Sequence, residues 1–150
     1  MVQFATYTSP LCPIEIGHED GKIISICRNN SFSRHNPSAV SDLANSQLQE
    51  YFNGRRKCFD LPIQPKGTPF QISVWKCMLE IPYGEVRTYG QIASAIGKPG
   101  ASRAVGQAAN RNPLWIVIPC HRVVGSNRAL TGYAGGLDMK QALLELEKNS

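Results

Sequence analysis

The spacing of apolar and polar positions predicts a mixed strand and helix region in the first third of the chain. Three short segments are rich in strand-forming residues, namely 4–9, 13–17 and 22–28. Glu19-Asp20-Gly21 supplies a turn between the last two of them. From Ser38 the apolar positions recur at helical spacing, and Gly54 would end that helix. This region therefore predicts a small scaffold of strands covered by one helix.

Proline and glycine interrupt the pattern between residues 60 and 69, with Pro62, Pro65, Gly67 and Pro69 in close succession. Such runs are typical of the connections between domains. We therefore expect two domains, residues 1–65 and residues 66–150.

The second half of the chain has mainly helical spacing. Helices are expected over residues 70–81, 89–97, 101–110 and 137–148. Thr88 and Gln91 match a capping box, which marks a helix start at Tyr89. Pro99-Gly100 would turn the chain between two short helices, as in a helix-turn-helix unit; an ordinary helical hairpin in a core is the alternative. The fold class is α+β, with a small N-terminal α/β scaffold domain and a mainly helical C-terminal domain that contains a helix-turn-helix.

A five-residue apolar run, Leu114 to Ile118, predicts a buried strand that leads into Pro119-Cys120-His121. A cysteine becomes a nucleophile when a base or a positive field holds its thiolate, and His121 is adjacent. Neighbouring side chains in a strand point to opposite faces, so the pair requires Pro119 to end the strand and the chain to turn at Cys120. The alternative is a small buried cysteine beside a satisfied core histidine.

The distribution of charged residues says more about the function of the chain than its overall composition does. The net charge is +5, and no acidic residue occurs between Glu85 and Asp138. Six basic residues lie in that window: Arg87, Lys98, Arg103, Arg111, Arg122 and Arg128. A polyanion is the natural partner of such a field, whereas a solvated basic face without a partner is the alternative.

No apolar run approaches the roughly 18 to 20 residues of a membrane span, and the N-terminus lacks a signal-peptide pattern. Five cysteines without a C-x-x-C spacing argue against a disulfide framework. We expect a soluble protein, cytoplasmic or, in a eukaryote, nuclear. The spacing of His18, His35 and the nearby cysteines matches no metal-ligand set, so no metal is expected.

The residues from Asn112 to Val123, NPLWIVIPCHRV, resemble the active-site signature of the O6-alkylguanine-DNA alkyltransferases. Similar matches occur in four other segments: Tyr89-Gly90-Gln91-Ile92-Ala93, Arg103-Ala104-Val105-Gly106, Gly132-Tyr133-Ala134-Gly135-Gly136 and Leu143-Leu144-Glu145-Leu146-Glu147. The resemblance is close over residues 68–148 and loose over the first 67.

The resemblance implies a catalytic group made of Cys120, His121, Glu147, Asn112 and Tyr89. The Cys120 thiolate would attack the alkyl carbon on guanine O6, and His121, oriented by Glu147, would take the thiol proton through a water. Asn112 would fix that water, and Tyr89 would supply or relay a proton to the leaving base. Because a thioether is a poor leaving group, the protein would be consumed in one turnover. No cofactor is implied.

The resemblance also implies a monomer that binds alkylated double-stranded DNA. The substrate pocket would include Tyr133, Ala134, Gly135 and Val123. The DNA contacts would be Arg103, Tyr89, Ala104, Gly106, Gln107, Arg111, Arg122 and Arg128. In the family an arginine at the position of Arg103 fills the stack that the extruded nucleotide leaves. Ala134 stands where the family often has serine, which removes one side-chain donor to O6.

Two other functions remain open from the sequence. Alkyltransferase-like proteins bind alkylated DNA on the same scaffold but replace the cysteine, so Cys120 argues for transfer. A cysteine hydrolase would need an oxyanion hole and turnover, and only the Cys120-His121 pair points in that direction.

Overall fold

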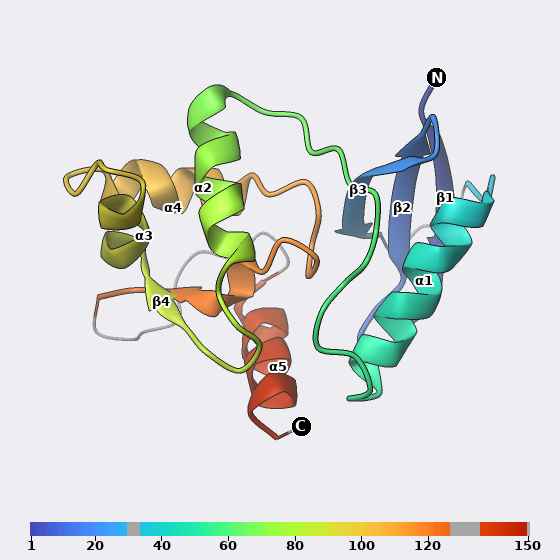
Figure 1. The fold of residues 1–150 in the computed structure, drawn as a ribbon. Helices are drawn as coiled ribbons and strands as arrows, with labels where there is room; N and C mark the ends of the chain where they lie inside the picture. Colours follow the sequence, from blue (N-terminus) through green and yellow to red (C-terminus); the bar gives the residue numbers. More distant parts are fainter. Residues whose placement is uncertain (30–33, 127–135, 150) are drawn as a thin grey trace. The chain divides into compact units, whose positions relative to one another are not determined.

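A computed structural model describes residues 1–29, 34–126 and 136–149 of the chain. They form two compact units, Met1–Lys66 and Gly67–Ser150 (Figure 1). A strand-rich first unit and a mainly helical second unit confirm the predicted α+β class. Within those ranges, no helix combines the length and the apolar character that a bilayer span requires.

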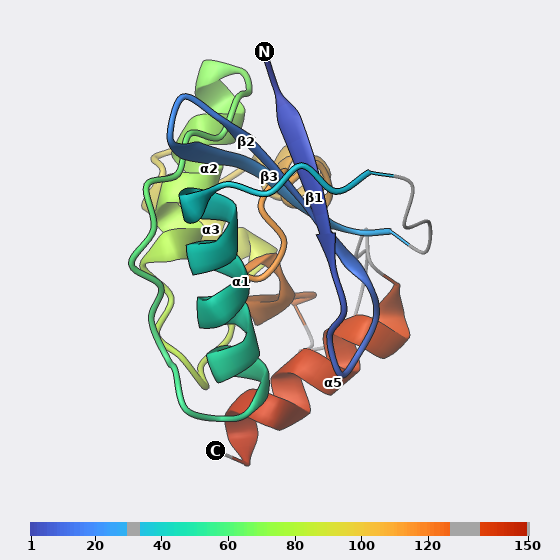
Figure 2. The same cartoon turned by 90° about the vertical axis from the view of Figure 1, so that its right-hand side faces the viewer.

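The first unit is a three-stranded antiparallel sheet covered by one helix (Figure 2). Its elements are β1 (Gln3–Tyr7), β2 (Ile14–Glu19), β3 (Lys22–Arg28) and α1 (Ala39–Phe52). Asp20 and Gly21 both have positive φ, 52° and 75°, which allows the two-residue turn between β2 and β3. Ile16 and Ile26 from the sheet are buried, as is Leu48 from α1. Leu43 of α1, although apolar, is exposed.

In the described part of the second unit there are five short helical segments and one pair of very short strands. In chain order these are α2 (Pro69–Leu79), β4 (Arg87–Thr88), α3 (Tyr89–Ala95), α4 (Ser102–Asn110), the 3-10 turn η1 (Cys120–Arg122), β5 (Val123–Val124) and α5 (Leu137–Lys148). Each predicted helix is present, with ends shifted by no more than two residues. Trp75 packs in the core of this unit, and its indole N–H donates to the Ala108 carbonyl at 2.9 Å, which links α2 to α4.

The helices α3 and α4 pack against each other through a tight connection. The capping box predicted at Thr88 is confirmed, since its side chain accepts from the Gln91 backbone and the Gln91 side chain accepts from the Thr88 N–H. Gly97 follows α3 with φ of 80°, a conformation that glycine adopts without strain. The use of this helix pair as a DNA-binding helix-turn-helix stays a prediction.

The expected strand over residues 114–118 is wrong. These residues form a buried turn in which the Ile118 N–H donates to the Leu114 carbonyl at 2.9 Å. Ile116 has φ of 73°, an uncommon conformation for a β-branched residue that persists only where the surroundings enforce it. The run has a proline on each side, and proline has no backbone N–H to donate to a neighbouring strand. The buried backbone groups of the run are hydrogen-bonded locally rather than in a sheet.

A two-residue parallel pairing joins β4 to β5, with Arg87 opposite Val123 and Thr88 opposite Val124. The strand β4 leads directly into the first residue of α3, and β5 directly follows the η1 turn. This pairing therefore places the start of α3 next to the end of the turn that carries Cys120.

We predict that Gly67→Ala destabilises the second unit. A methyl group at this position would lie 2.5 Å from Cη2 of Trp75, a ring already held by its hydrogen bond to Ala108. Overpacking of this kind typically costs about 1–3 kcal/mol. Urea denaturation measures the change in the free energy of unfolding.

Gly100→Ala is the matched control, because a methyl group there has no heavy atom within 4 Å. Its effect should stay within about 0.5 kcal/mol. Equal effects of the two substitutions would contradict the packing argument.

Candidate active site

Cys120 is the first residue of the η1 turn, directly after Pro119. The Arg122 N–H donates to the Pro119 carbonyl at 2.9 Å, which closes the turn. This meets the condition set by the sequence, that the chain must turn at Cys120 for Cys120 and His121 to belong to one site. Cys120 is 6% exposed, so the thiol lies just below the surface of the described structure.

Asn112 clamps the turn through three hydrogen bonds. Its Nδ2 donates to the Ile118 carbonyl at 2.7 Å and to Sγ of Cys120 at 3.1 Å. Its Oδ1 accepts from the Leu114 N–H at 2.9 Å, which fixes the amide orientation. A donor aimed at the sulfur favours the thiolate over the neutral thiol, because only the anion is a strong acceptor.

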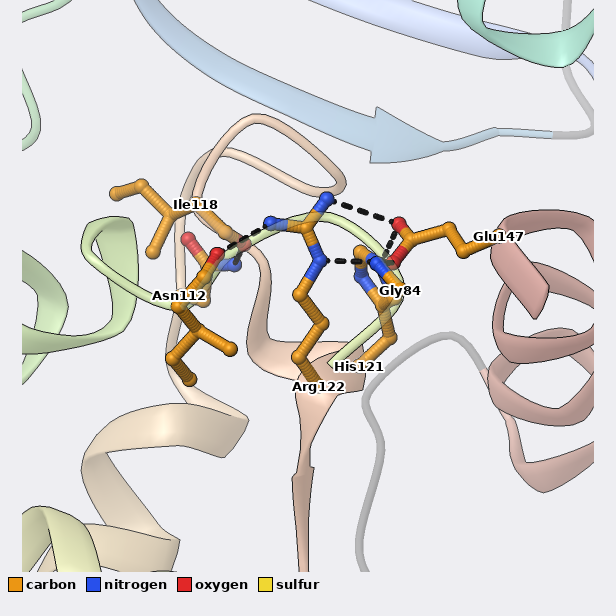
Figure 3. A network of polar contacts seen from close by, with 7 residues as sticks. Gly84, Asn112, Ile118, His121, Arg122 and Glu147 are labelled. Atoms are coloured by element: carbon orange, nitrogen blue, oxygen red, sulfur yellow. Dashed lines mark hydrogen bonds and ion pairs between the residues drawn. The ribbon is translucent and has the colours of Figure 1, made fainter. Parts of the chain in front are cut away.

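His121 and Glu147 form a buried pair between η1 and α5 (Figure 3). His121 Nε2 and Glu147 Oε2 are 2.6 Å apart. The same carboxylate accepts from Arg122 Nε at 2.8 Å, from Arg122 Nη2 at 3.0 Å and from the Gly84 N–H at 3.2 Å. A carboxylate with this many donors is ionised and acts only as an acceptor, so Nε2 carries the imidazole proton.

The tautomer leaves Nδ1 of His121 with a lone pair. Nδ1 is buried and has no hydrogen-bond partner among the described residues. Burial lowers the pKa of His121, although the hydrogen bond and the charge of Glu147 partly oppose that effect. The imidazole is therefore neutral at physiological pH and is suited to accept a proton at Nδ1.

Arg122 corrects one prediction from the sequence. It is only 6% exposed, and its guanidinium holds Glu147 with two nitrogens while Nη1 donates to the Ile81 carbonyl at 2.7 Å. Because its guanidinium nitrogens are hydrogen-bonded inside the protein, this arginine does not offer a surface contact to DNA. It follows Cys120 and His121 in a buried turn, and its charge is balanced by Glu147 rather than by phosphate.

Tyr89 and Lys140 lie close to each other. Tyr89 is half-buried at the start of α3, and Nζ of Lys140 is 5.8 Å from the centroid of its ring. Lys140 was missed from the sequence. The helical spacing of α5 could have indicated that Lys140 is buried, because it shares a face with Leu143 and Glu147, three and seven residues further on.

The other predicted site residues fall into three groups. Arg103, Ala104, Gln107 and Arg111 are exposed on α4 or just after it, and Gly106 is half-buried. Val123 is fully buried in β5. Arg128, Tyr133, Ala134 and Gly135 lie outside the described residues. A cysteine turn, a neutral base and an exposed basic helix thus occur in one unit.

Among residues 1–29, 34–126 and 136–149, no cluster of three or more histidine, cysteine or acidic side chains is arranged to hold a metal ion. The described site contains the Cys120 thiol, the Asn112 amide that donates to it and the His121–Glu147 pair. The second unit thus carries, among its described residues, a buried cysteine turn, a buried His–Glu pair and a helix pair with exposed basic residues.

Comparison with known proteins identifies the family. Residues 69–149 match the family described as "6-O-methylguanine DNA methyltransferase, DNA binding domain", and residues 2–65 match its "ribonuclease-like domain". The chain belongs to the 6-O-methylguanine DNA methyltransferase family. This confirms the resemblance seen in the sequence and extends it over residues 2–65.

The relatives cover nearly the whole chain. A methylated-DNA–protein-cysteine methyltransferase of Methanosarcina acetivorans is 50% identical over 96% of this chain and 97% of its own length. The crystal structure of Mycobacterium tuberculosis O6-methylguanine methyltransferase is 42% identical, with a TM-score of 0.91 over 99% of this chain and 94% of that one. A structure of M. tuberculosis OGT in complex with DNA is 43% identical, also with a TM-score of 0.91, over 98% and 93%.

We predict that Glu147→Gln strongly destabilises the protein. Removal of this charge leaves the buried Arg122 guanidinium without its anion, a change that typically costs about 3–5 kcal/mol. Glu145→Gln is the control on the same helix, since Glu145 is exposed, and its effect should stay within about 0.5 kcal/mol. Urea denaturation of both variants provides the comparison, and equal stabilities would contradict a central role for Glu147.

Proposed function

We propose that this chain repairs DNA by direct damage reversal, through transfer of a methyl or other alkyl group from O6-alkylguanine to Cys120. The supporting observation is the position of the Cys120 thiol, which accepts a hydrogen bond from Asn112 and directly precedes the buried His121–Glu147 pair. Relatives at 44–50% identity over nearly the whole chain are named methylated-DNA–protein-cysteine methyltransferases. The chain acts as an enzyme of this class in a single turnover.

The proposed reaction begins with loss of the thiol proton from Cys120 to Nδ1 of His121 through a water. The thiolate then attacks the alkyl carbon in line, so that the S–C bond forms while the C–O6 bond breaks. The electron pair of the broken bond goes to guanine, and Tyr89 supplies the proton that neutralises the leaving base. Since a thioether does not leave readily, no second step regenerates the thiol.

Two residues support the reacting groups without contacting the alkyl carbon. Glu147 fixes the His121 tautomer and stabilises the imidazolium that forms, in the way an acidic residue does in hydrolytic triads. Asn112 holds the turn and stabilises the thiolate. Arg122 acts one step further away, because it holds the Glu147 carboxylate in place.

The proposed partner is alkylated double-stranded DNA, bound by the basic surface of α3 and α4. Arg103 would enter the space left by the extruded nucleotide, since its planar guanidinium can stack and donate hydrogen bonds at once. The small residues Ala104 and Gly106 allow the helix to approach the DNA closely, and Gln107 and Arg111 add contacts at its edge. Tyr133, Ala134, Gly135 and Arg128 are proposed for the pocket and DNA contacts from family resemblance.

We further propose that residues 1–65 act as a scaffold domain and residues 66–150 as the DNA-binding alkyltransferase domain. The protein would work as a monomer wherever DNA is kept, in the cytoplasm or, in a eukaryote, in the nucleus. A lesion-binding protein without transfer activity is disfavoured, because Cys120 and its supporting residues are all present.

We predict that Cys120→Ser abolishes transfer and leaves DNA affinity nearly unchanged, because the thiolate serves the chemistry and the exposed basic residues serve binding. After incubation with O6-methylguanine DNA, intact mass should show one added methyl group on the wild-type chain and none on the variant. Methyl transfer in the variant would disprove the assignment. Demethylated product from wild-type protein of unchanged mass would indicate a hydrolase instead.

We predict that Arg103→Lys slows transfer from duplex DNA by about tenfold or more and has little effect on transfer from free O6-alkylguanine. Lysine keeps the charge but lacks the planar group that replaces the lost stacking, which is worth a few kcal/mol. Single-turnover rates on both substrates provide the measurement. Arg111→Lys is the control, since a phosphate contact depends mainly on charge. An equal loss on both substrates would make Arg103 a structural residue.

A further inference from the structure

A cavity of about 330 Å³ lies between the end of α2, the strand β4 and the helix α3 in the second unit. Its apolar walls are Ile81, Ile92 and Ala95. A volume of this size lies at the lower end of the range for small-molecule sites, about 300–1,000 Å³. Cys120 does not line this cavity, and the mechanism proposed above makes no use of it.

The walls of the cavity are fixed by the hydrogen bonds of the fold. The Ile81 carbonyl accepts from Nη1 of Arg122 at 2.7 Å, and Arg87 lies opposite Val123 in the pairing of β4 with β5. Ile92 is almost completely buried in α3. The cavity is therefore preformed, and a ligand that enters it does not have to order the protein around it.

Two of the lining residues offer hydrogen-bond donors. Oε1 of Gln91 accepts from the Thr88 N–H at 2.8 Å, which fixes the side-chain amide and leaves its NH₂ group as a donor. Arg87 donates to Glu85 at 3.0 Å and to the Val86 carbonyl at 2.9 Å. A guanidinium has more N–H groups than these two bonds use, and Glu85 balances its charge.

Glu80 offers the complementary acceptor. It is exposed, and no cation among the described residues forms an ion pair with its carboxylate. Burial raises the pKa of the neighbouring Cys77 thiol, and the charge of Glu80 raises it further, which indicates that the carboxylate lies near this lining residue. An ionised carboxylate accepts hydrogen bonds with two oxygens and donates none.

This set of groups selects the chemistry of a ligand. An anion would be repelled by Glu80, and a simple cation would leave the donors of Gln91 and Arg87 unused. A neutral planar ring with two adjacent N–H donors and nearby acceptors would use all three residues and cover the apolar walls. Guanine has this pattern, because its N1–H and its exocyclic amino group lie side by side, next to O6 and N7.

We propose that this cavity is a second binding site for a guanine base, distinct from the reaction site at Cys120. The base would donate from N1 and from its amino group to Glu80, while Gln91 and Arg87 donate to O6 and N7. Free guanosine and a guanine in single-stranded DNA share this chemistry. The inference goes beyond the proposed function and does not depend on alkyl transfer, because binding is measured in the resting protein.

The first test is a titration of the ¹⁵N-labelled full chain with guanosine, followed by NMR. Saturable shifts of the backbone amides of Cys77, Ile92 and Ala95 are expected. Inosine, which lacks the exocyclic amino group, should bind at least about fivefold more weakly, since a bidentate contact is reduced to a single one. Shifts confined to residues around Cys120, or no saturable shift at the cavity, would overturn the proposal.

The second test fills the cavity without removing a polar group. Ala95→Phe should weaken guanosine binding by about tenfold or more, because the ring occupies the space of the ligand. Ser94→Phe is the matched control, since it adds the same ring at an exposed position of α3 that does not line the cavity, and it should keep the wild-type affinity. Equal affinities of the two variants would contradict the assignment.

A third variant keeps the proposal testable if Ala95→Phe does not fold. Glu80→Gln changes an exposed side chain and replaces one of its two acceptor atoms by a donor. The preference for guanosine over inosine should therefore shrink in this variant to about twofold or less. An undiminished preference would show that Glu80 does not read the base, and the proposal would fail.

Two oligonucleotides distinguish the sources of the base. A single-stranded oligothymidine with one central guanine should produce the cavity shifts if guanine in DNA is a ligand, and the all-thymine strand should not. Shifts with guanosine alone would restrict the site to the free base or nucleoside. Methyl transfer from O6-methylguanine DNA is assayed separately, so its absence would reject the proposed function and leave the guanine site in place.

Discussion

The buried carboxylate of Glu147 is the interaction on which the rest of the site depends. An ionised carboxylate inside a protein is tolerated only when donors surround it, and this one accepts from His121, from two nitrogens of Arg122 and from the Gly84 backbone. These donors come from segments about 25 and 63 residues away in the chain. One side chain of α5 thereby fixes the cysteine turn and the loop before β4 in a single arrangement.

The backbone around Cys120 extends this arrangement toward α3 and α4, the two helices proposed to bind DNA. Asn112, which follows α4, clamps the turn from one end, and the pairing of β4 with β5 anchors it from the other. Because β4 leads directly into α3, the nucleophile is tied at both ends to the two helices proposed to bind DNA. A base extruded toward α3 and α4 would thus meet a thiol whose position is set by the same elements.

A buried pair of opposite charges lies beside a neutral base in the described site. Arg122 balances Glu147, and both side chains are almost completely buried. His121 donates to the same carboxylate, and burial lowers its pKa, so it accepts a proton instead of holding one at rest. This pairing keeps the Glu147 charge compensated inside the protein.

The sequence by itself determined the features that depend on near neighbours. Helical spacing, capping boxes such as Thr88 with Gln91, and turns at glycine and proline are encoded within a few residues, so the elements and the α+β class were predictable. The sequence set a turn after Pro119 only as a condition for the Cys120–His121 pair, and the structure meets that condition. The family signature then indicated Glu147 and Asn112, which no local pattern would have selected.

Only the tertiary structure decided where each charge points. Arg122 belonged by sequence to a basic surface, yet it turns inward to Glu147, and Lys140 resembled any polar residue of a surface helix until α5 packed against η1. The apolar run 114–118 had the composition of a strand, but no neighbouring strand pairs with it in the described structure, and it closes on itself as a turn. The physical reason is that burial, charge compensation and strand pairing depend on residues distant in the sequence, which local periodicity does not specify.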